Sequence, residues 1–239
     1  MKTYNVHQIR QADEVKQALL ISLPIVLSYL PVAIAYGVLA KQAGLNLLEL
    51  TSMSAFVYAG ASQFMAINMM MVGSGVIEIV IATLVLNFRH FIMNLSLMSQ
   101  LTTVSQRSKV PLSLGITDET FAVASLQMEK KKENHSITFF AILVLSAYLS
   151  WVIGSFVGGL LGQVIPDQLS QSMGIALYAM FIGLLIPSVK QEFKYGLIAL
   201  FAMILNLAFV QFISEGWSII CATIIGASAG IFLLKDDQS

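Results

Sequence analysis

Long apolar runs separated by short polar links dominate the chain. Seven of these runs are long enough to cross a bilayer as helices, since about 20 apolar residues span a hydrocarbon core of ~30 Å. Some links, such as 73–75 and 214–216, leave no room for a soluble domain between the helices. The pattern therefore predicts an all-α polytopic membrane protein with a single transporter-sized domain over residues 1–239, and spans at about 17–40, 50–72, 76–101, 137–162, 172–189, 194–213 and 217–234.

Composition supports the same class. The chain has 239 residues, of which 57% are hydrophobic and 11% are charged, and its mean hydropathy is +0.81. Soluble domains carry about 25% charged residues, so this is an integral membrane protein whose surroundings are the lipid bilayer. The 13 basic and 13 acidic residues cancel, and nothing in the charge favours a nucleic-acid partner. The single cysteine, Cys221, forms no internal disulfide.

The two ends are polar. Residues 1–16 form a polar segment that is too long and too charged for the head of a signal peptide, and the apolar run after it lacks a cleavage pattern. We expect that run to be retained as the first membrane helix. Residues 235–239 form a short polar tail.

An eighth segment, 111–128, is only moderately apolar and carries Asp118 and Glu119 near its centre. It fits a re-entrant hairpin, a broken span or a surface helix. Lysine and arginine favour the cytoplasmic side of membrane proteins. If the N-terminus is internal and this segment crosses the membrane, nine basic residues lie inside and three outside. An external N-terminus with a segment that does not cross gives the same count. The count makes Lys130, Lys131 and Lys132 cytoplasmic, and we favour an internal N-terminus because the first helix often dominates orientation.

The run at 76–101 is amphipathic although it is apolar enough to span. On a helical wheel at about 100° per residue, Asn87, Arg89, His90 and Asn94 share one half with Ser96 and Gln100. A second arc is apolar and contains Leu84, Val85, Phe88, Phe91, Ile92 and Leu95. A charge at the bilayer centre costs roughly 2.5–3.5 kcal/mol on insertion scales. The polar half must therefore face protein or a wet cavity.

Arg89 needs an anion, and Asp118 and Glu119 are the candidates that the sequence offers. One interpretation is a structural ion pair with no role in transport. The interpretation we favour is that this polar half lines a substrate path. His90 either responds to protons, because histidine titrates near neutrality, or forms an ordinary hydrogen bond between helices. We expect no metal site, since the other two histidines lie outside the spans and no ligand cluster is present.

Two further stretches carry polar or helix-breaking residues within apolar runs. Gly60, Ser62 and Gln63 lie in a small-residue segment that predicts close helix packing, or space and exposed backbone beside a substrate. Pro24 and Pro31 each remove a helix hydrogen bond and free a carbonyl. They predict either a simple kink or a discontinuous helix of the kind that holds substrates in secondary transporters.

Four motifs occur in order along the chain: PIVLSYLPVAIAYGVLA (24–40), YAGASQF (58–64), NFRH (87–90) and GITDETFA (115–122). Together they resemble the AzlC family, the BrnF-like large subunits of bacterial branched-chain amino acid exporters, over essentially the whole chain. The resemblance implies a multi-pass protein of the bacterial cytoplasmic membrane that exports leucine, isoleucine, valine and in some members methionine. It also implies a small AzlD-like membrane subunit as partner.

The residues suggest how such a protein binds its substrate. An amino acid zwitterion needs a cation or amide for its carboxylate and an anion or carbonyl for its ammonium. We expect Arg89, helped by Asn87 or Gln63, to hold the carboxylate. We expect Asp118 or Glu119, or carbonyls freed by the two prolines, to hold the ammonium. The side-chain pocket would come from residues such as Phe64, Met65 and Phe91. The predicted substrate path thus comprises Pro24, Pro31, Gly60, Ser62, Gln63, Asn87, Arg89, His90, Asn94, Asp118 and Glu119.

The chain contains no GxxxxGK[ST] motif, so we expect no ATP hydrolysis by this subunit, no cofactor, and a gradient as the energy source. The alternative is a channel or a non-transporting membrane partner of another system. An enzyme is disfavoured, because no nucleophile or metal set accompanies His90.

Overall fold

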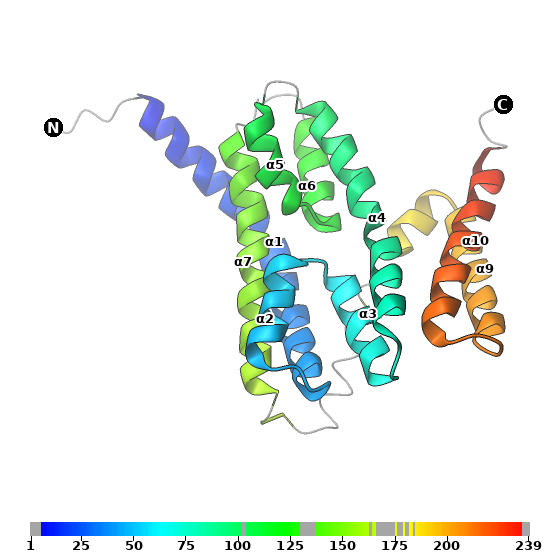
Figure 1. Ribbon diagram of the computed structural model, residues 1–239. Coiled ribbons are helices and arrows are strands. Elements are labelled where there is room, and N and C mark those ends of the chain that lie inside the picture. Colours follow the sequence, from blue (N-terminus) through cyan, green and yellow to red (C-terminus); the bar gives the residue numbers. More distant parts are fainter. Residues whose placement is uncertain are drawn as a thin grey trace. The chain divides into compact units, whose positions relative to one another are not determined.

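The computed structural model describes residues 6–101, 104–129, 137–162, 164–165, 175, 179, 182–183 and 185–235. Within these ranges the regular secondary structure is helical (Figure 1). Half of the expected span at 172–189 and all of the lysines at 130–132 lie outside the described residues. The chain divides into two compact units, residues 1–60 with 87–164 and residues 61–86 with 165–239.

Among the described residues, three helices are long and apolar enough to span a membrane, namely α1 (Val6–Gln42) from Asp13 onward, α4 (Val76–Gln100) and α7 (Ile137–Leu161). They confirm the spans expected at 17–40, 76–101 and 137–162. Helix α1 runs without interruption through Pro24 and Pro31. Of the two alternatives for these prolines, the discontinuous helix is therefore wrong. Much of the polar segment at 1–16 is also helical, because α1 already begins at Val6.

Helices α1 and α7 lie side by side and form the core of the first unit (Figure 1). Glycines bring the two backbones into contact. A methyl group at Gly37 would lie 2.1 Å from the carbonyl oxygen of Ser155, and one at Gly158 would lie 2.1 Å from that of Ile34. Small residues let membrane helices approach closely where no hydrophobic effect pulls them together. This seam fixes α1 and its polar residues against α7.

The expected span at 50–72 is not one helix, and this expectation was wrong. Helix α2 (Leu47–Phe56) ends, and α3 (Gly60–Met71) begins after a three-residue break at 57–59. A capping box starts α2, in which the Glu49 N–H donates to Asn46 Oδ1 and the Asn46 N–H donates to Glu49 Oε2. Such a box satisfies two free amides at the start of a helix.

The segment at 111–128 is broken, which favours the broken span or the re-entrant hairpin over a single surface helix. Helix α5 (Gln106–Leu114) ends before Gly115, and α6 (Asp118–Glu129) begins after Thr117. Both short helices pack against α7 in the first unit. The break places the two acidic residues in the first turn of α6.

The second unit contains α9 (Lys194–Phe209) and α10 (Glu215–Lys235), which pack together as a hairpin (Figure 1). They correspond to the spans expected at 194–213 and 217–234. Met69, Ala82 and Ile220 form a buried apolar cluster in this unit. The Ser218 hydroxyl donates to the side chain of Asn206 over 2.6 Å and ties the two helices of the hairpin together.

Candidate substrate site

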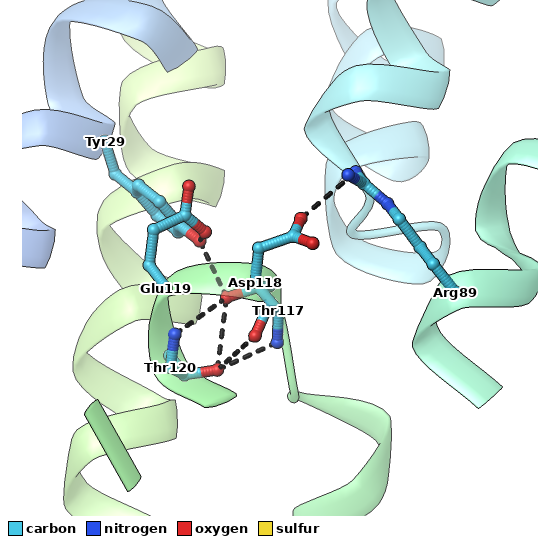
Figure 2. A network of polar contacts seen from close by, with 6 residues as sticks. All are labelled: Tyr29, Arg89, Thr117, Asp118, Glu119 and Thr120. Atoms are coloured by element: carbon cyan, nitrogen blue, oxygen red, sulfur yellow. Dashed lines mark hydrogen bonds and ion pairs between the residues drawn. The ribbon is translucent and has the colours of Figure 1, made fainter. Parts of the chain in front are cut away.

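An ion pair joins α4 to the start of α6. Arg89 Nη2 lies 3.1 Å from Asp118 Oδ2, and the two side chains are 30% and 23% exposed (Figure 2). The arginine in the apolar helix therefore has the anionic partner that its position demanded. The apolar arc of α4 points outward, since Phe88, Phe91 and Leu95 are all more than half exposed. On the polar half, Asn87, Arg89, His90 and Asn94 are partly buried, whereas Ser96 and Gln100 are exposed.

The chain at the start of α6 folds into a reciprocal threonine cap (Figure 2). The Thr117 N–H donates to Thr120 Oγ1 over 2.8 Å, and the Thr120 N–H donates to Thr117 Oγ1 over 3.4 Å. This is the capping-box geometry with a threonine in place of the usual glutamate. It satisfies amides that a helix start leaves free. The first-turn position also favours the negative charges of Asp118 and Glu119, because a helix N-terminus carries partial positive charge.

Tyr29 of α1 connects this cap to the first helix (Figure 2). Its hydroxyl lies 2.5 Å from Glu119 Oε2 and 2.7 Å from Thr117 Oγ1. An ionised carboxylate only accepts hydrogen bonds, so Tyr29 donates its single proton to Glu119 and can accept one from Thr117. Tyr29 is 6% exposed, and its ring meets the Trp151 ring edge-on at 5.4 Å. The acidic pair is thus divided: Asp118 faces Arg89, and Glu119 faces Tyr29.

Several polar atoms around this cluster are buried without a partner. The Oδ1 atoms of Asn87 and Asn94, Arg89 Nε and Ser125 Oγ find no hydrogen bond among the described residues. Asn94 uses its Nδ2 to donate to the backbone carbonyl of His90. Buried polar groups in proteins are nearly always satisfied by protein, water or ligand. The polar half of α4 therefore offers hydrogen-bonding capacity that a polar ligand or water can use.

The remaining residues of the predicted substrate path lie in different parts of the structure. His90 is half-buried, close enough to Arg89 and Asp118 to interact with them electrostatically. Pro24 and Pro31 flank Tyr29 on α1. Gly60 begins α3 with its Cα against Trp151. Ser62 and Gln63 are buried and belong to the second unit. Among the described residues, no His, Cys, Asp or Glu group of three is placed to hold a metal ion.

A second feature of the first unit is a cavity of about 800 Å³ beside the break between α2 and α3. Tyr58, at the centre of the break, borders it. The cavity lies between the end of α2, helix α5 and the first half of α7. Its wall is mainly apolar and consists of Ala55, Phe56, Val57, Tyr58, Arg107, Ser108, Pro111, Leu112, Leu114, Gly115, Ile137, Ala141, Val144, Leu145 and Tyr148. The pocket expected from Phe64, Met65 and Phe91 does not coincide with it.

Comparison with known proteins assigns the family. A profile of the AzlC protein family matches residues 24–165. The inner membrane protein YgaZ of Escherichia coli K12 is 32% identical over 209 residues, which cover 86% of this chain and 84% of that protein. The chain belongs to the AzlC family. Within this family, the branched-chain amino acid transport protein AzlC of Bacillus subtilis 168 is 24% identical over 73% of this chain and 67% of its own length. No solved structure matches.

The AzlC match gives the chain its class and covers the candidate site. AzlC relatives are named as membrane proteins in bacteria and in the archaeon Archaeoglobus fulgidus, where a membrane protein is 29% identical over 87% of this chain. With its long apolar helices, this chain is a multi-pass membrane protein of a transport-associated family. The matched region runs from α1 to just past α7 and so contains the Arg89 cluster, both helix breaks and the cavity.

Sequence reasoning missed three polar residues of the site. Thr117 and Thr120 have the spacing of a helix cap directly before two acids, and this pattern could have been recognised. Tyr29 lies in an apolar run with no local feature to distinguish it, since its partner is 90 positions away. Tyr58, which borders the cavity, entered the sequence analysis only as the first residue of the YAGASQF motif.

Proposed function

We propose that this protein is the large subunit of a secondary exporter of branched-chain amino acids, with leucine, isoleucine and valine as substrates and methionine as a further one. It works with a small AzlD-like membrane subunit, and an ion or membrane-potential gradient supplies the energy. Family membership gives the substrate class its main support. The single structural observation that carries the proposal is the Arg89–Asp118 pair beside Glu119, within a partly buried polar surface of α4.

An ion pair of this kind suits a zwitterion. The main chain of a free amino acid carries a carboxylate and an ammonium. The carboxylate can therefore replace Asp118 as the partner of Arg89, and the ammonium can replace Arg89 as the partner of Asp118. The substrate carboxylate binds the guanidinium of Arg89, because a planar guanidinium can donate two parallel hydrogen bonds to a carboxylate. The substrate ammonium binds the carboxylate of Asp118, that of Glu119, or both. The net charge in the membrane stays the same throughout, which avoids the large cost of an isolated buried ion.

The unsatisfied atoms have a place in this scheme. Arg89 Nε and Asn87 Oδ1 have no partner among the described residues. The Nε–H is the second donor that a bidentate carboxylate needs, and an amide oxygen accepts from an ammonium. Glu119 is held by Tyr29, so its carboxylate stays oriented when the substrate leaves.

Labelled-leucine counterflow tests the function. Proteoliposomes hold the purified protein with its co-expressed small subunit, are loaded with unlabelled leucine, and receive labelled leucine outside. We expect transient accumulation for the parent, a large loss in Arg89→Ala, and an intermediate rate in Arg89→Lys, which keeps the charge but not the fork. Lys190→Ala removes a charge at an exposed position and serves as the control. A channel or a scaffold gives no counterflow, and parent-like exchange by both Arg89 variants would contradict the role of this residue.

The direction of transport needs intact cells. Cells fed a leucine-containing dipeptide release leucine internally and depend on export to limit it. Deleting this gene, its small-subunit neighbour, or both should raise intracellular leucine to a similar extent, because neither subunit exports alone. A lower leucine level after deletion would indicate uptake and contradict the export proposal.

A further inference from the structure

The break between α2 and α3 holds an aromatic residue in a rare backbone conformation. Tyr58 has φ of 44°, and it is the only described residue other than glycine with a positive φ. This left-handed region is unfavourable for bulky residues. Such strained residues persist where the surrounding structure enforces them, and they cluster at functional sites. The conformation is thus a reason to ask what the Tyr58 side chain does.

The side chain of Tyr58 is buried but its hydroxyl is unsatisfied. The residue is 6% exposed, and its hydroxyl has no hydrogen-bond partner among the described residues. The neighbouring Tyr148 differs, because its hydroxyl donates to the carbonyl of Ala55 over 3.0 Å. The two rings pack edge to face at 5.0 Å. Leaving a buried hydroxyl unpaired is unfavourable, so an apolar phenylalanine would suit this place better if packing were the only requirement.

Tyr58 also lies near two features that a substrate needs. It borders the apolar cavity of about 800 Å³. Glu119 is close enough to interact with it electrostatically. The cavity is within the size range of small-molecule sites, which combine apolar walls with a few polar groups. Its wall also reaches Gly115, two residues before the threonine cap that orients Glu119.

We infer that Tyr58 is a substrate-binding residue and that this cavity receives the apolar side chain of the transported amino acid. The inference rests on the proposed function and specifies where the substrate lies. The ammonium approaches Glu119, the Tyr58 hydroxyl hydrogen-bonds the polar end of the substrate, and the branched side chain enters the cavity between α2, α5 and α7. A cavity of this size accepts leucine, isoleucine and valine alike. It rejects polar side chains because its wall gives them few partners.

Removing the hydroxyl tests the role of Tyr58. Tyr58→Phe keeps the ring and its packing against Tyr148. We expect it to fold with equal or higher thermal stability, since an unsatisfied buried group is lost, and to lower leucine counterflow by roughly tenfold. Tyr195→Phe removes a hydroxyl in the second unit from a side chain that is 41% exposed, and should leave counterflow unchanged. Parent-like counterflow in Tyr58→Phe would overturn the inference.

Filling the cavity tests where the side chain lies. Ala141 lines the cavity from α7 and is exposed, so Ala141→Phe adds bulk there without crowding the core. Ala208→Phe makes the same change at an exposed position of α9 outside the cavity. We expect Ala141→Phe to reduce leucine exchange by roughly tenfold and valine exchange less, because valine is shorter. The control should change neither.

The outcomes separate this inference from the function on which it rests. A parent protein that exchanges no branched-chain amino acid contradicts both. A parent that exchanges leucine, with an Ala141→Phe variant that reduces leucine and valine equally or not at all, overturns the cavity as the side-chain site and leaves the exporter proposal intact.

Discussion

Removing the charges of Arg89 and Asp118 one at a time and together separates a structural ion pair from a substrate site. Arg89→Gln and Asp118→Asn each leave one charge without its partner. Breaking a fully buried pair costs about 3–5 kcal/mol, whereas exposed pairs contribute about 0–1 kcal/mol. The side chains are 30% and 23% exposed and form one contact at 3.1 Å. We therefore expect each single variant to lose about 2 kcal/mol, which lies between those limits.

The double variant should recover much of that loss, because two neutral amides replace the pair and no unpaired charge remains. The coupling between the two sites should be about 1 kcal/mol or more. A convenient assay uses Cys221, the only cysteine, which is free and partly buried. A thiol-reactive dye reports thermal unfolding of the detergent-purified protein, and about 2 kcal/mol corresponds to roughly 4–8 °C in Tm for a chain of this size.

Transport then decides the role of the pair. If Arg89 and Asp118 bind the zwitterion, the double variant regains stability while leucine counterflow stays low. If the pair only holds α4 to α6, counterflow recovers together with stability. A double variant that exchanges leucine at the parent rate would refute the substrate role. A double variant whose loss equals the sum of the single losses would refute the energetic coupling.

Other predictions concern the framework of the site. Gly37→Ala places a methyl 2.1 Å from the backbone oxygen of Ser155. We expect it to lower the free energy of unfolding by about 3 kcal/mol or more and to leave little monodisperse protein on size-exclusion chromatography. Gly75→Ala, where nothing lies within 4 Å, should behave like the parent. Thr117→Ala removes half of the cap of α6 and should cost about 1 kcal/mol, seen as a Tm lowered by roughly 2–4 °C. Thr117→Ser should retain the parent Tm, and a lowered Tm there would contradict the capping role.

The long helices were predictable from sequence because membrane insertion is determined by local composition. A run of about 20 apolar residues spans a bilayer whatever its tertiary neighbours, and α1, α4 and α7 follow this rule. The partly buried position of Arg89 was predictable for the same reason, since a charge within an apolar helix must avoid lipid. The acids were expected near Arg89 because a guanidinium within an apolar helix needs an anionic partner.

The break at Tyr58 was not predictable, because no proline or charged residue marks it. It depends on packing between residues far apart in sequence. A methyl at Gly60 would meet the Trp151 ring at 2.5 Å, and the Tyr58 ring lies against Tyr148. The prolines left both a simple kink and an interrupted first helix open, and α1 continues through both positions, since a proline bends a helix without necessarily ending it.

The two breaks of the first unit, at 57–59 and 115–117, border the same cavity through Tyr58 and Gly115. Backbone that leaves a helix exposes amides and carbonyls, and at membrane depth this is tolerated only where the backbone is buried in protein or lines a cavity. Both breaks therefore place free backbone groups beside the same cavity, whose wall is otherwise mainly apolar. The guanidinium of Arg89 and the two carboxylates of α6 are unfavourable in lipid for the same reason, and the carboxylates follow directly after the second break. The broken helices and the charged residues thus share one requirement, which is shelter from lipid, and the proposed substrate brings both charges and an apolar side chain to it.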